Sequence, residues 1–325
     1  MGDRIGVLLV QLGGPERREE LRPFLYELFS DPEILGFPAP LRQAVALLLA
    51  SLRAPTAAKT YERIGWSPIR RWSRLQAGLL ERELLAQGQP AAVRVGMTCS
   101  EPTVEGALAE LREAGVSRLV VLPLYPQYSV TTTKGSFDRV TRALARSGWR
   151  PKRLDAPGAW HDEPHFIAAH ADRIRAAAAT LPDADAGRTV LLYSAHSLPV
   201  ATVEKKNDPY PRQIADTVDA IDAALGRRYR SRLGYQSKVG PVAWLTPSTG
   251  DVLKELAAEG VRQVVVVPVA FVSDHVETLY ECRILYGEEA ARLGIPHYVV
   301  TEGLNDHPEF IRALAAVVSR RLAEA

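Results

Sequence analysis

The chain alternates short apolar runs with longer amphipathic stretches. The short runs are rich in Val, Leu and Ile and lack the alternation of a half-exposed strand, which predicts strands buried on both faces. The order strand, helix, strand predicts parallel sheets covered by helices. The predicted strands are Ile5–Val10, Ala92–Gly96, Leu119–Leu122, Val190–Tyr193, Leu233–Gln236, Val264–Val267 and Tyr298–Val300. The predicted helices are Leu75–Ala86, Val104–Ala114, Pro164–Ala178, Ile214–Leu225, Val252–Ala258 and Phe310–Leu322.

Two pairs of segments resemble each other within the chain. Gly115–Pro123 matches Gly260–Pro268, and Val7–Val10 matches Val190–Tyr193. The matches favour two similar α/β halves, although the residue preferences that all helix–strand junctions share would also produce such short matches. Pro and Gly in Leu154–Gly158 predict that the chain crosses between the halves there.

Composition and charge exclude several classes of protein. A chain of 325 residues with 46% hydrophobic residues is not disordered and is long enough for two domains. Lys and Arg (40) nearly balance Asp and Glu (38), which argues against a dedicated nucleic-acid binder. Two cysteines, Cys99 and Cys282, are too few for a four-cysteine metal site and predict reduced thiols. The N-terminus lacks a signal-peptide layout and no apolar run reaches the roughly 18–20 residues of a membrane span, so we predict a cytoplasmic protein, at most peripheral to a membrane.

A histidine follows one of the buried strands. Ligands of parallel sheets bind at the carboxyl ends of the strands, and His196 follows the predicted strand Val190–Tyr193 by three residues, flanked by small residues. Its ordinary pKa of about 6.5 makes imidazole a proton acceptor and a metal ligand near neutral pH. A structural, hydrogen-bonded histidine is the alternative at this point.

Carboxylates follow another buried strand. Ser273 or Asp274 predicts a helix N-cap after Val264–Val267, so that Asp274, Glu277 and Glu281 would share one helix face. Like charges in line ease the uptake of a proton or a cation. We favour a functional role for Glu277, whereas Asp274 could simply complement the helix dipole.

A leucine-rich amphipathic helix is predicted over Pro38–Arg53, ending at Ala54-Pro55, with Arg63 a short distance beyond. It could pack on a sheet with a basic solvated face. An apolar lip rimmed with arginines would equally suit a flat, carboxylate-bearing ligand or an anionic membrane surface.

Several motifs occur in order along nearly the whole chain: Leu12–Pro15, Leu28–Asp31, Pro126–Ser129, Ser194–Pro199, Asp208–Pro211, Gln236–Pro241 with Trp244-Leu245, and Phe271–Glu281. Through them the chain resembles the ferrochelatases, which insert ferrous iron into a porphyrin in haem synthesis. The last long motif is the most specific.

The resemblance implies a class of fold and a division into domains. It implies α/β architecture with two Rossmann-like domains, each a parallel sheet flanked by helices, and a porphyrin cleft between them. Residues 1–158 with 302–325 would form the N-terminal domain, which carries the porphyrin lip and the returning last helix. Residues 159–301 would form the second domain, which carries His196 and Glu277.

The resemblance also implies roles for particular residues. His196 and Glu277 match the family's active-site histidine and glutamate. His196 would accept the pyrrole protons, Glu277 would orient it or relay protons, and both suit transient Fe(II) ligation. The residues that would contact the porphyrin are Leu12, Arg63, Tyr128, Ser129 and Trp244.

The implied substrates are a porphyrin and Fe(II), with no nucleic acid, no resident cofactor and no [2Fe–2S] cluster, in a monomer or homodimer. Leu12 stands where ferrochelatases that act on coproporphyrin have a tyrosine facing the metal, which favours protoporphyrin IX over coproporphyrin III. The alternatives are a cobalt or nickel chelatase of another tetrapyrrole and a non-catalytic haem or porphyrin carrier. The leucine-rich lip argues against the former, and the presence of both His196 and Glu277 argues against the latter.

Overall fold

A computed structural model of the protein describes residues 3–182, 187–238 and 240–324. Val239, within the motif Gln236–Pro241, and the N-terminal Met1 and Gly2 lie outside the described residues. The chain divides into two compact units, the first comprising residues 1–160 and 311–325 and the second residues 161–310.

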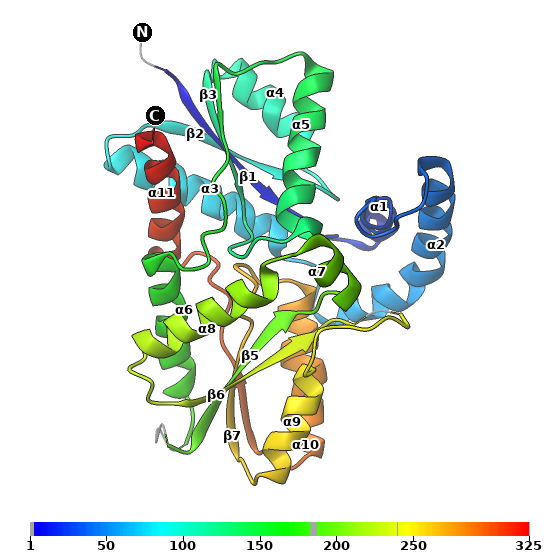
Figure 1. Ribbon diagram of the computed structural model, residues 1–325, viewed down its shortest axis with the longest axis vertical. Coiled ribbons are helices and arrows are strands. Elements are labelled where there is room, and N and C mark those ends of the chain that lie inside the picture. The colour runs from blue at the N-terminus through cyan, green and yellow to red at the C-terminus, as the bar shows by residue number, and fades with distance from the viewer. Residues whose placement is uncertain (1–2, 183–186, 239, 325) are drawn as a thin grey trace. The chain divides into compact units, whose positions relative to one another are not determined.

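The first unit contains a four-stranded parallel sheet with the order β2-β1-β3-β4. Its strands are β1 (Ile5–Gln11), β2 (Ala91–Met97), β3 (Arg118–Pro123) and β4 (Arg153–Asp155). In Figure 1, α4 (Val104–Glu113) and α5 (Gly135–Ser147) cover one face, and α3 (Ile69–Ala86) and α11 (Pro308–Ala323) cover the other. The connections of the neighbours β1 and β3 therefore leave to opposite faces, and open α/β sheets bind ligands outside the carboxyl ends of such a pair.

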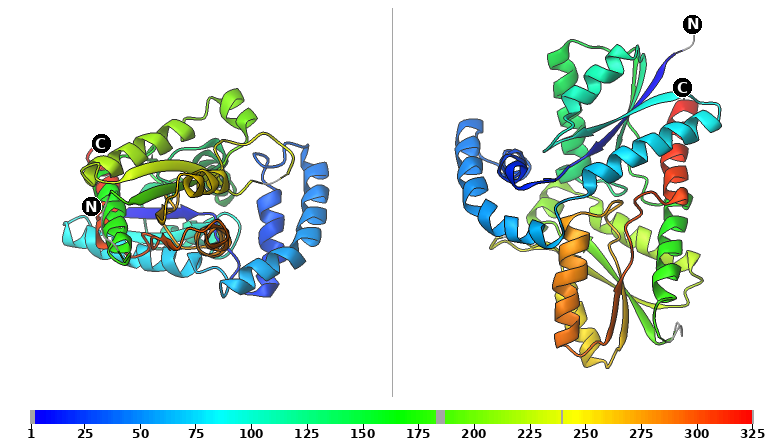
Figure 2. Two further views of the ribbon diagram at one scale, coloured as in Figure 1. Left: turned by 90° about the horizontal axis from the view of Figure 1, so that it is seen from below. Right: turned by 180° about the vertical axis from the view of Figure 1, so that it is seen from behind.

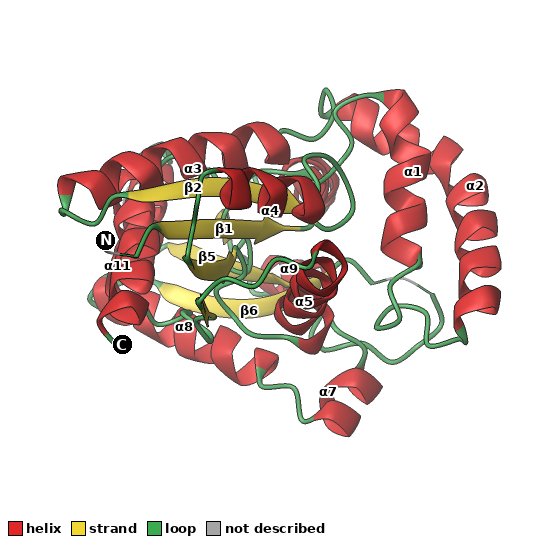
Figure 3. Cartoon of the chain, turned by 90° about the horizontal axis from the view of Figure 1, so that it is seen from above, coloured by secondary structure: helices red, strands yellow, loops and turns green. Residues whose placement is uncertain are grey.

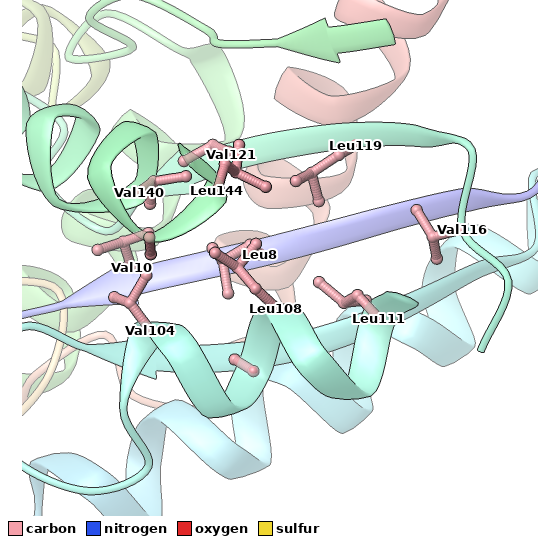
Figure 4. Packing of buried hydrophobic residues seen from close by; sticks show 12 residues of the cluster. Leu8, Val10, Val104, Leu108, Leu111, Val116, Leu119, Val121, Val140 and Leu144 are labelled. Atoms are coloured by element: carbon pink, nitrogen blue, oxygen red, sulfur yellow. The ribbon is translucent and has the colours of Figure 1, made fainter. Parts of the chain in front are cut away.

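The core of this unit explains its uninterrupted apolar strands. Leu8 and Val10 of β1 face the same side and meet Leu108 of α4 and Val140 of α5 (Figure 4). Leu9 lies between them in the strand, points to the other face and is also fully buried. Because both faces are covered, polar residues cannot alternate with apolar ones.

Two further helices of the first unit, α1 (Arg18–Phe29) and α2 (Ala39–Arg63), pack against each other. The prediction that the second ends at Ala54-Pro55 is wrong, because α2 continues through Pro55 to Arg63. Proline cannot donate a hydrogen bond to the carbonyl of Ser51, but both residues are exposed, so water can take that carbonyl. α2 also exposes a row of leucines: Leu41, Leu47, Leu48 and Leu52.

The second unit repeats this arrangement. Its parallel sheet has the order β6-β5-β7-β8, with β5 (Thr189–His196), β6 (Arg230–Gln236), β7 (Gln263–Val267) and β8 (His297–Val300). Its helices are α6 (Pro164–Ala178), α7 (Val200–Lys206), α8 (Tyr210–Ala224), α9 (Thr249–Ala258) and α10 (Tyr286–Arg292). Figure 2, right, shows this unit from behind, with α10 in the orange helix beside the strands.

Each unit also contains a π-helix after its third strand in chain order. η1 (Val130–Lys134) precedes α5, and η2 (Glu277–Leu285) precedes α10. Single turns of π-helix are uncommon in proteins and are frequent at functional sites.

The predicted fold class is confirmed: both units are parallel sheets flanked by helices, as Figure 3 shows by element type. The seven predicted strands all occur, and the matched sequence segments form β3 and β7, and β1 and β5, which occupy the same places in the two sheets. β4 was not predicted, because three residues with the sequence Arg-Leu-Asp make no apolar run.

Residues 302–310 belong to the second unit, whereas the sequence placed them with the first. They follow β8 and lie against β7 and the loop after it: the preceding Thr301 N donates to Val266 O of β7 (2.9 Å), and Asn305 N donates to Val272 O (2.9 Å). Among the helices that the described residues form, we find none long and apolar enough to cross a bilayer.

Candidate active site

His196 is the last residue of β5, at the carboxyl end of the strand. It pairs in register with Gln236 of β6, Ser197 N donates to Gln236 O (2.9 Å), and Tyr210 OH donates to His196 O (3.0 Å). The main chain around the imidazole is thus fixed, while its side chain remains 38% exposed.

Glu277 is the first residue of the π-helix η2, after β7. β5 and β7 are neighbours in the sheet whose connections leave to opposite faces, and the residues that follow them, His196 and Glu277, meet. The sequence suggested a position at a strand end for each residue separately. The structure shows that these two positions are in contact, although the residues are 81 positions apart in the chain.

The predicted helix start at Ser273 or Asp274 is wrong, and so is the shared face that included Asp274. Asp274 is buried and accepts hydrogen bonds from Thr278 Oγ (2.9 Å) and Asn305 Nδ2 (2.8 Å), so it anchors the loop after β8. η2 begins only at Glu277, and its i→i+5 hydrogen bonding places residues four apart nearly above one another. Glu277 and Glu281 therefore share one face without Asp274.

His196 and Glu277 form a tight pair. Nδ1 of His196 lies 2.7 Å from Oε2 of Glu277, a distance typical of charge-assisted hydrogen bonds. Because an ionised carboxylate can only accept, Nδ1 carries the hydrogen and the lone pair of the neutral ring is on Nε2. Burial would lower the pKa of His196, but the Glu277 carboxylate raises it above its ordinary value. Burial would likewise raise the pKa of Glu277, but His196 and His275 hold it well below its ordinary range.

A second imidazole approaches Glu277 from the other side. Nε2 of His275 lies 3.7 Å from Oε1 of Glu277, and its Nδ1 donates to Ser273 O (3.0 Å). Its ring is 4.7 Å from that of Phe271. Each oxygen of Glu277 thus faces one histidine, which fixes the plane of the carboxylate.

Behind the pair lies a layer of polar side chains. Ser237 Oγ lies 2.8 Å from Oε2 of Glu277 and 2.8 Å from Oε2 of Glu281. Gln236 Nε2 donates to Glu277 O (3.3 Å), and its Oε1 accepts from Ser194 Oγ (2.5 Å) and Cys282 Sγ (3.0 Å). Burial first, and the Glu277 charge second, raise the pKa of Glu281 to about 7.

Sequence reasoning did not assign roles to Ser237, Gln236 or His275. Gln236 is the last residue of β6 and Ser237 follows it. The expectation that ligands bind at the carboxyl ends of strands, which identified His196, could therefore have identified both. His275 lies two residues before Glu277, a spacing that by itself favours no contact in a helix.

Four of the predicted porphyrin contacts lie in the first unit. Leu12 directly follows β1, is half-buried, and its carbonyl accepts from Cys99 N (2.9 Å). Arg63 is exposed at the end of α2, and Tyr128 is half-buried. Ser129 is 1% exposed and caps η1 by accepting from Thr131 N (3.2 Å), which gives its hydroxyl a structural task.

Trp244, the fifth, lies in the second unit on the loop after β6. This loop runs beside the segment that follows His196: Trp244 forms an antiparallel bridge with Pro199, and Leu245 N donates to Leu198 O (3.0 Å). Trp244 is half-buried, and its Nε1 is shielded from water with no hydrogen-bond partner among the described residues. An unused donor of this kind is available to a ligand.

Candidate metal ligands are few. Within the described part of the chain, no three or more His, Cys, Asp or Glu side chains are grouped so that they could hold a metal ion. Cys99 belongs to the first unit and Cys282 to the second, and both are buried free thiols. Burial raises the pKa of Cys99 to about 12, so its thiol stays protonated at neutral pH.

Solved structures identify the class of fold. SirB from Bacillus subtilis, solved with Fe3+, resembles the chain with a TM-score of 0.60 at 12% identity, over 99% of this chain and 96% of that one. CbiX, described as the terminal enzyme for siroheme biosynthesis in denitrifying bacteria, resembles it with a TM-score of 0.54 at 16% identity, over 97% and 98%. The chain therefore has the fold of these two proteins.

Sequence comparison identifies the family. The sequence model of the ferrochelatase family matches residues 4–322. The ferrochelatase of Synechococcus elongatus is 42% identical over 99% of this chain and 83% of its own length, and that of Gloeobacter violaceus is 41% identical over 98% of both chains. This chain belongs to the ferrochelatase family, the enzymes that insert iron into a porphyrin in haem biosynthesis, as its motifs implied.

Proposed function

We propose that this protein inserts Fe(II) into protoporphyrin IX and that His196 is the base that accepts the pyrrole protons. The observation that carries the proposal is the 2.7 Å contact between His196 Nδ1 and Glu277 Oε2 at the carboxyl end of β5, in a chain of the ferrochelatase family. Insertion exchanges two N–H protons of the porphyrin for one Fe2+, so the site needs a base within hydrogen-bond reach of the macrocycle.

The pair is suited to accept a proton. Donation from Nδ1 to Glu277 leaves the lone pair of His196 on Nε2, and the partial exposure of the side chain keeps this nitrogen accessible. When Nε2 takes up a proton, the neighbouring carboxylate stabilises the imidazolium, which is the reason the pKa of His196 is raised. Glu277 is then the residue that orients the base.

The same two side chains suit the incoming iron. Imidazole nitrogen and carboxylate oxygen are both ligands that Fe(II) accepts. Fe(II) is a substrate here, and we propose that His196 and Glu277 contact it in passing before the porphyrin nitrogens take over. A flat macrocycle resists the entry of a metal, so contacts remote from the reacting nitrogens would have to bend it.

For the porphyrin we propose contacts to Leu12, Arg63, Tyr128, Ser129 and Trp244. Trp244 supports this because it offers an aromatic ring and an unused Nε1 donor, and because its backbone bridges to Pro199 in the segment after His196. The exposed guanidinium of Arg63 has the charge to meet a propionate. Ser129 contributes by holding η1, and Leu12 favours the less polar protoporphyrin over coproporphyrin III.

An anaerobic insertion assay tests the proposal. Loss of porphyrin fluorescence on addition of Fe(II) is followed with protoporphyrin IX and with coproporphyrin III in parallel. We expect turnover of both with the higher kcat/KM for protoporphyrin IX. Tight binding of porphyrin without metallation would refute catalysis and indicate a carrier, and a higher kcat/KM for coproporphyrin III would refute the proposed substrate.

We also propose that the reaction needs no resident cofactor and that the protein attaches peripherally to membranes. The exposed leucines of α2, Leu41, Leu47, Leu48 and Leu52, support the attachment because apolar side chains on a basic helix bind the interface of anionic bilayers. Metal analysis of active protein tests the first point. Co-sedimentation with vesicles containing phosphatidylserine tests the second, and Leu48→Ser with Leu52→Ser should reduce it.

A further inference from the structure

The motif Asp208–Pro211 begins α8, and one of its side chains reaches the main chain of the candidate base. Tyr210 is the first residue of α8 and is 7% exposed. Its OH donates to the backbone carbonyl of His196 (3.0 Å), although the two residues are 14 positions apart. A buried tyrosine at a helix start therefore binds the end of the strand that carries the imidazole.

The peptide unit between His196 and Ser197 is bound at both of its polar groups. Its N–H, from Ser197, donates to Gln236 O of β6 (2.9 Å). In a trans peptide the carbonyl points the opposite way, so His196 O points away from β6. On that side of β5 lies β7, which has already ended at Val267. The hydroxyl of Tyr210 takes the place of the donor that a longer strand would supply.

The start of α8 holds Tyr210 rigidly. Pro209 and Pro211 flank it, and the ring of each fixes its own φ near −65°. Asp208 is 5% exposed, and its Oδ1 accepts from Tyr210 N (3.0 Å), a first-turn N–H that has no partner within the helix. Because the backbone is restrained on both sides of Tyr210, its hydroxyl is held at a fixed place beside β5.

We propose that Tyr210 is a positioning residue for iron insertion: its hydroxyl fixes the peptide plane at His196 and so keeps the imidazole in contact with Glu277. This inference rests on the proposed function, since it matters for catalysis only if His196 is the base. The side chain of His196 is 38% exposed and ends a strand, so it has room to move. A turn of its peptide plane would shift Nδ1 from its place 2.7 Å from Glu277 Oε2.

Tyr210→Phe tests the inference, because it removes the hydroxyl and keeps the buried ring. We expect kcat for iron insertion to fall about tenfold, since a displacement of 1 Å at a reacting group can cost about a hundredfold. We expect KM for the porphyrin to stay within twofold of wild type, because the hydroxyl contacts the main chain of the protein and leaves the proposed porphyrin contacts unchanged.

Tyr193→Phe is the matched control. Tyr193 lies on the same strand β5, is fully buried, and its OH also donates to an oxygen of the protein, Asp222 Oδ1 (2.7 Å). Each variant loses one hydrogen bond of a buried tyrosine, so both should melt roughly 2–4 °C below wild type. Assayed where circular dichroism shows both to be folded, Tyr193→Phe should keep kcat within twofold of wild type.

NMR of protein with isotope-labelled histidine gives a readout that does not depend on turnover. The hydrogen on Nδ1 of His196 lies in a short hydrogen bond to Glu277, and its signal is assigned by its loss in His196→Ala. We expect this signal to shift or broaden in Tyr210→Phe and to stay in place in Tyr193→Phe. A merely structural role of Tyr210 would affect the two variants alike.

The outcomes are distinguishable. Near-normal kcat in Tyr210→Phe would overturn the inference, as would an unmoved His196 signal or an equal loss of kcat in Tyr193→Phe. Failure of Tyr210→Phe to fold would also overturn it, because the hydroxyl would then hold the unit together and not the base. All of these results leave the proposed function standing, because wild-type turnover is measured first. Absence of wild-type turnover would refute the proposed function, whereas the NMR comparison would still show whether Tyr210 positions His196.

Discussion

The two units of this protein share an architecture but differ in chemistry. Both have a parallel sheet in which the first and third strands are neighbours, and both have a π-helix after the third strand. η2 carries Glu277 and Glu281, whereas η1 carries three threonines and a lysine. The fold therefore provides an equivalent strand end and π-helix in each unit, and the side chains there decide which unit can accept protons.

The pairing registers make the comparison residue by residue. Tyr193 of β5 pairs with Val267, and Leu9 of β1 pairs with Leu122, where Val267 and Leu122 each precede a proline. Counting three residues onward from each reaches His196 in one unit and Leu12 in the other. The residue proposed to accept protons and the residue proposed to select the porphyrin therefore occupy equivalent positions.

The largest effect should come from His196→Ala. We expect insertion to slow by about 10²–10⁴-fold, the usual contribution of a general base, with an unchanged circular dichroism spectrum. Adding Leu12→His to this variant should not restore activity, because η1 has no carboxylate to orient the new ring. A near-normal rate in His196→Ala would refute the mechanism, and rescue by Leu12→His would show that position alone is sufficient.

Glu277→Gln tests the partner in the pair and should have the next largest effect. The Glu277 charge raises the pKa of His196 against the opposing effect of burial, so its loss should shift the titration of His196 to lower pH. We expect a rate loss of roughly ten- to a hundredfold. NMR titration of the imidazole and the pH–rate profile measure both effects, and an unmoved His196 titration would contradict the assignment.

Glu281→Gln should change the pH dependence of stability. Burial and the Glu277 charge raise the pKa of Glu281 to about 7, above the value of about 4.3 in an unfolded chain. Between these values the folded state retains a proton that the unfolded state has released, so stability is lost as pH rises from about 4.3 to 7. Glu281→Gln should therefore melt above wild type at pH 8, by roughly 2–4 °C for each kcal/mol, and not at pH 4. Equal melting shifts at the two pH values would contradict this.

Leu12→Ala should have the smallest effect and sharpens the contrast with His196. Loss of an apolar side chain should raise KM for protoporphyrin IX by roughly two- to tenfold through lost burial, with kcat within about twofold. Parallel assays with coproporphyrin III show whether the preference narrows. A large fall in kcat would mean that Leu12 acts on the reacting centre and that the two equivalent positions do not divide the work as proposed.

Much of this could be predicted from sequence because the signals were local. Buried strands are recognisable as apolar runs. His196 and the residues after Val267 were found because ligands bind at the carboxyl ends of strands. The failures were local rules applied where the surroundings of the residue in the folded chain, either other side chains or water, decided the outcome. Asp274 has the composition of a helix cap, yet Thr278 and Asn305 hold its carboxylate in another role. Pro55 has the signature of a helix end, yet α2 continues past it. Ser51 is exposed, so water can take the carbonyl that Pro55 leaves without a donor.

By itself the sequence determined the two α/β halves, the family, and His196 and Glu277 as single candidate residues, since each of these signals lies in a short contiguous segment. The tertiary structure decided that η2 begins only at Glu277 and is a π-helix, and that Asp274 is held by Thr278 and Asn305 instead of sharing the face of Glu277. It also decided that Ser237, 40 residues before Glu277, lies between the two carboxylates. The spacing of Glu277 and Glu281 already placed them on one helix face, but the position of Ser237 cannot be derived from spacing, because it depends on where the end of β6 meets the turn after β7.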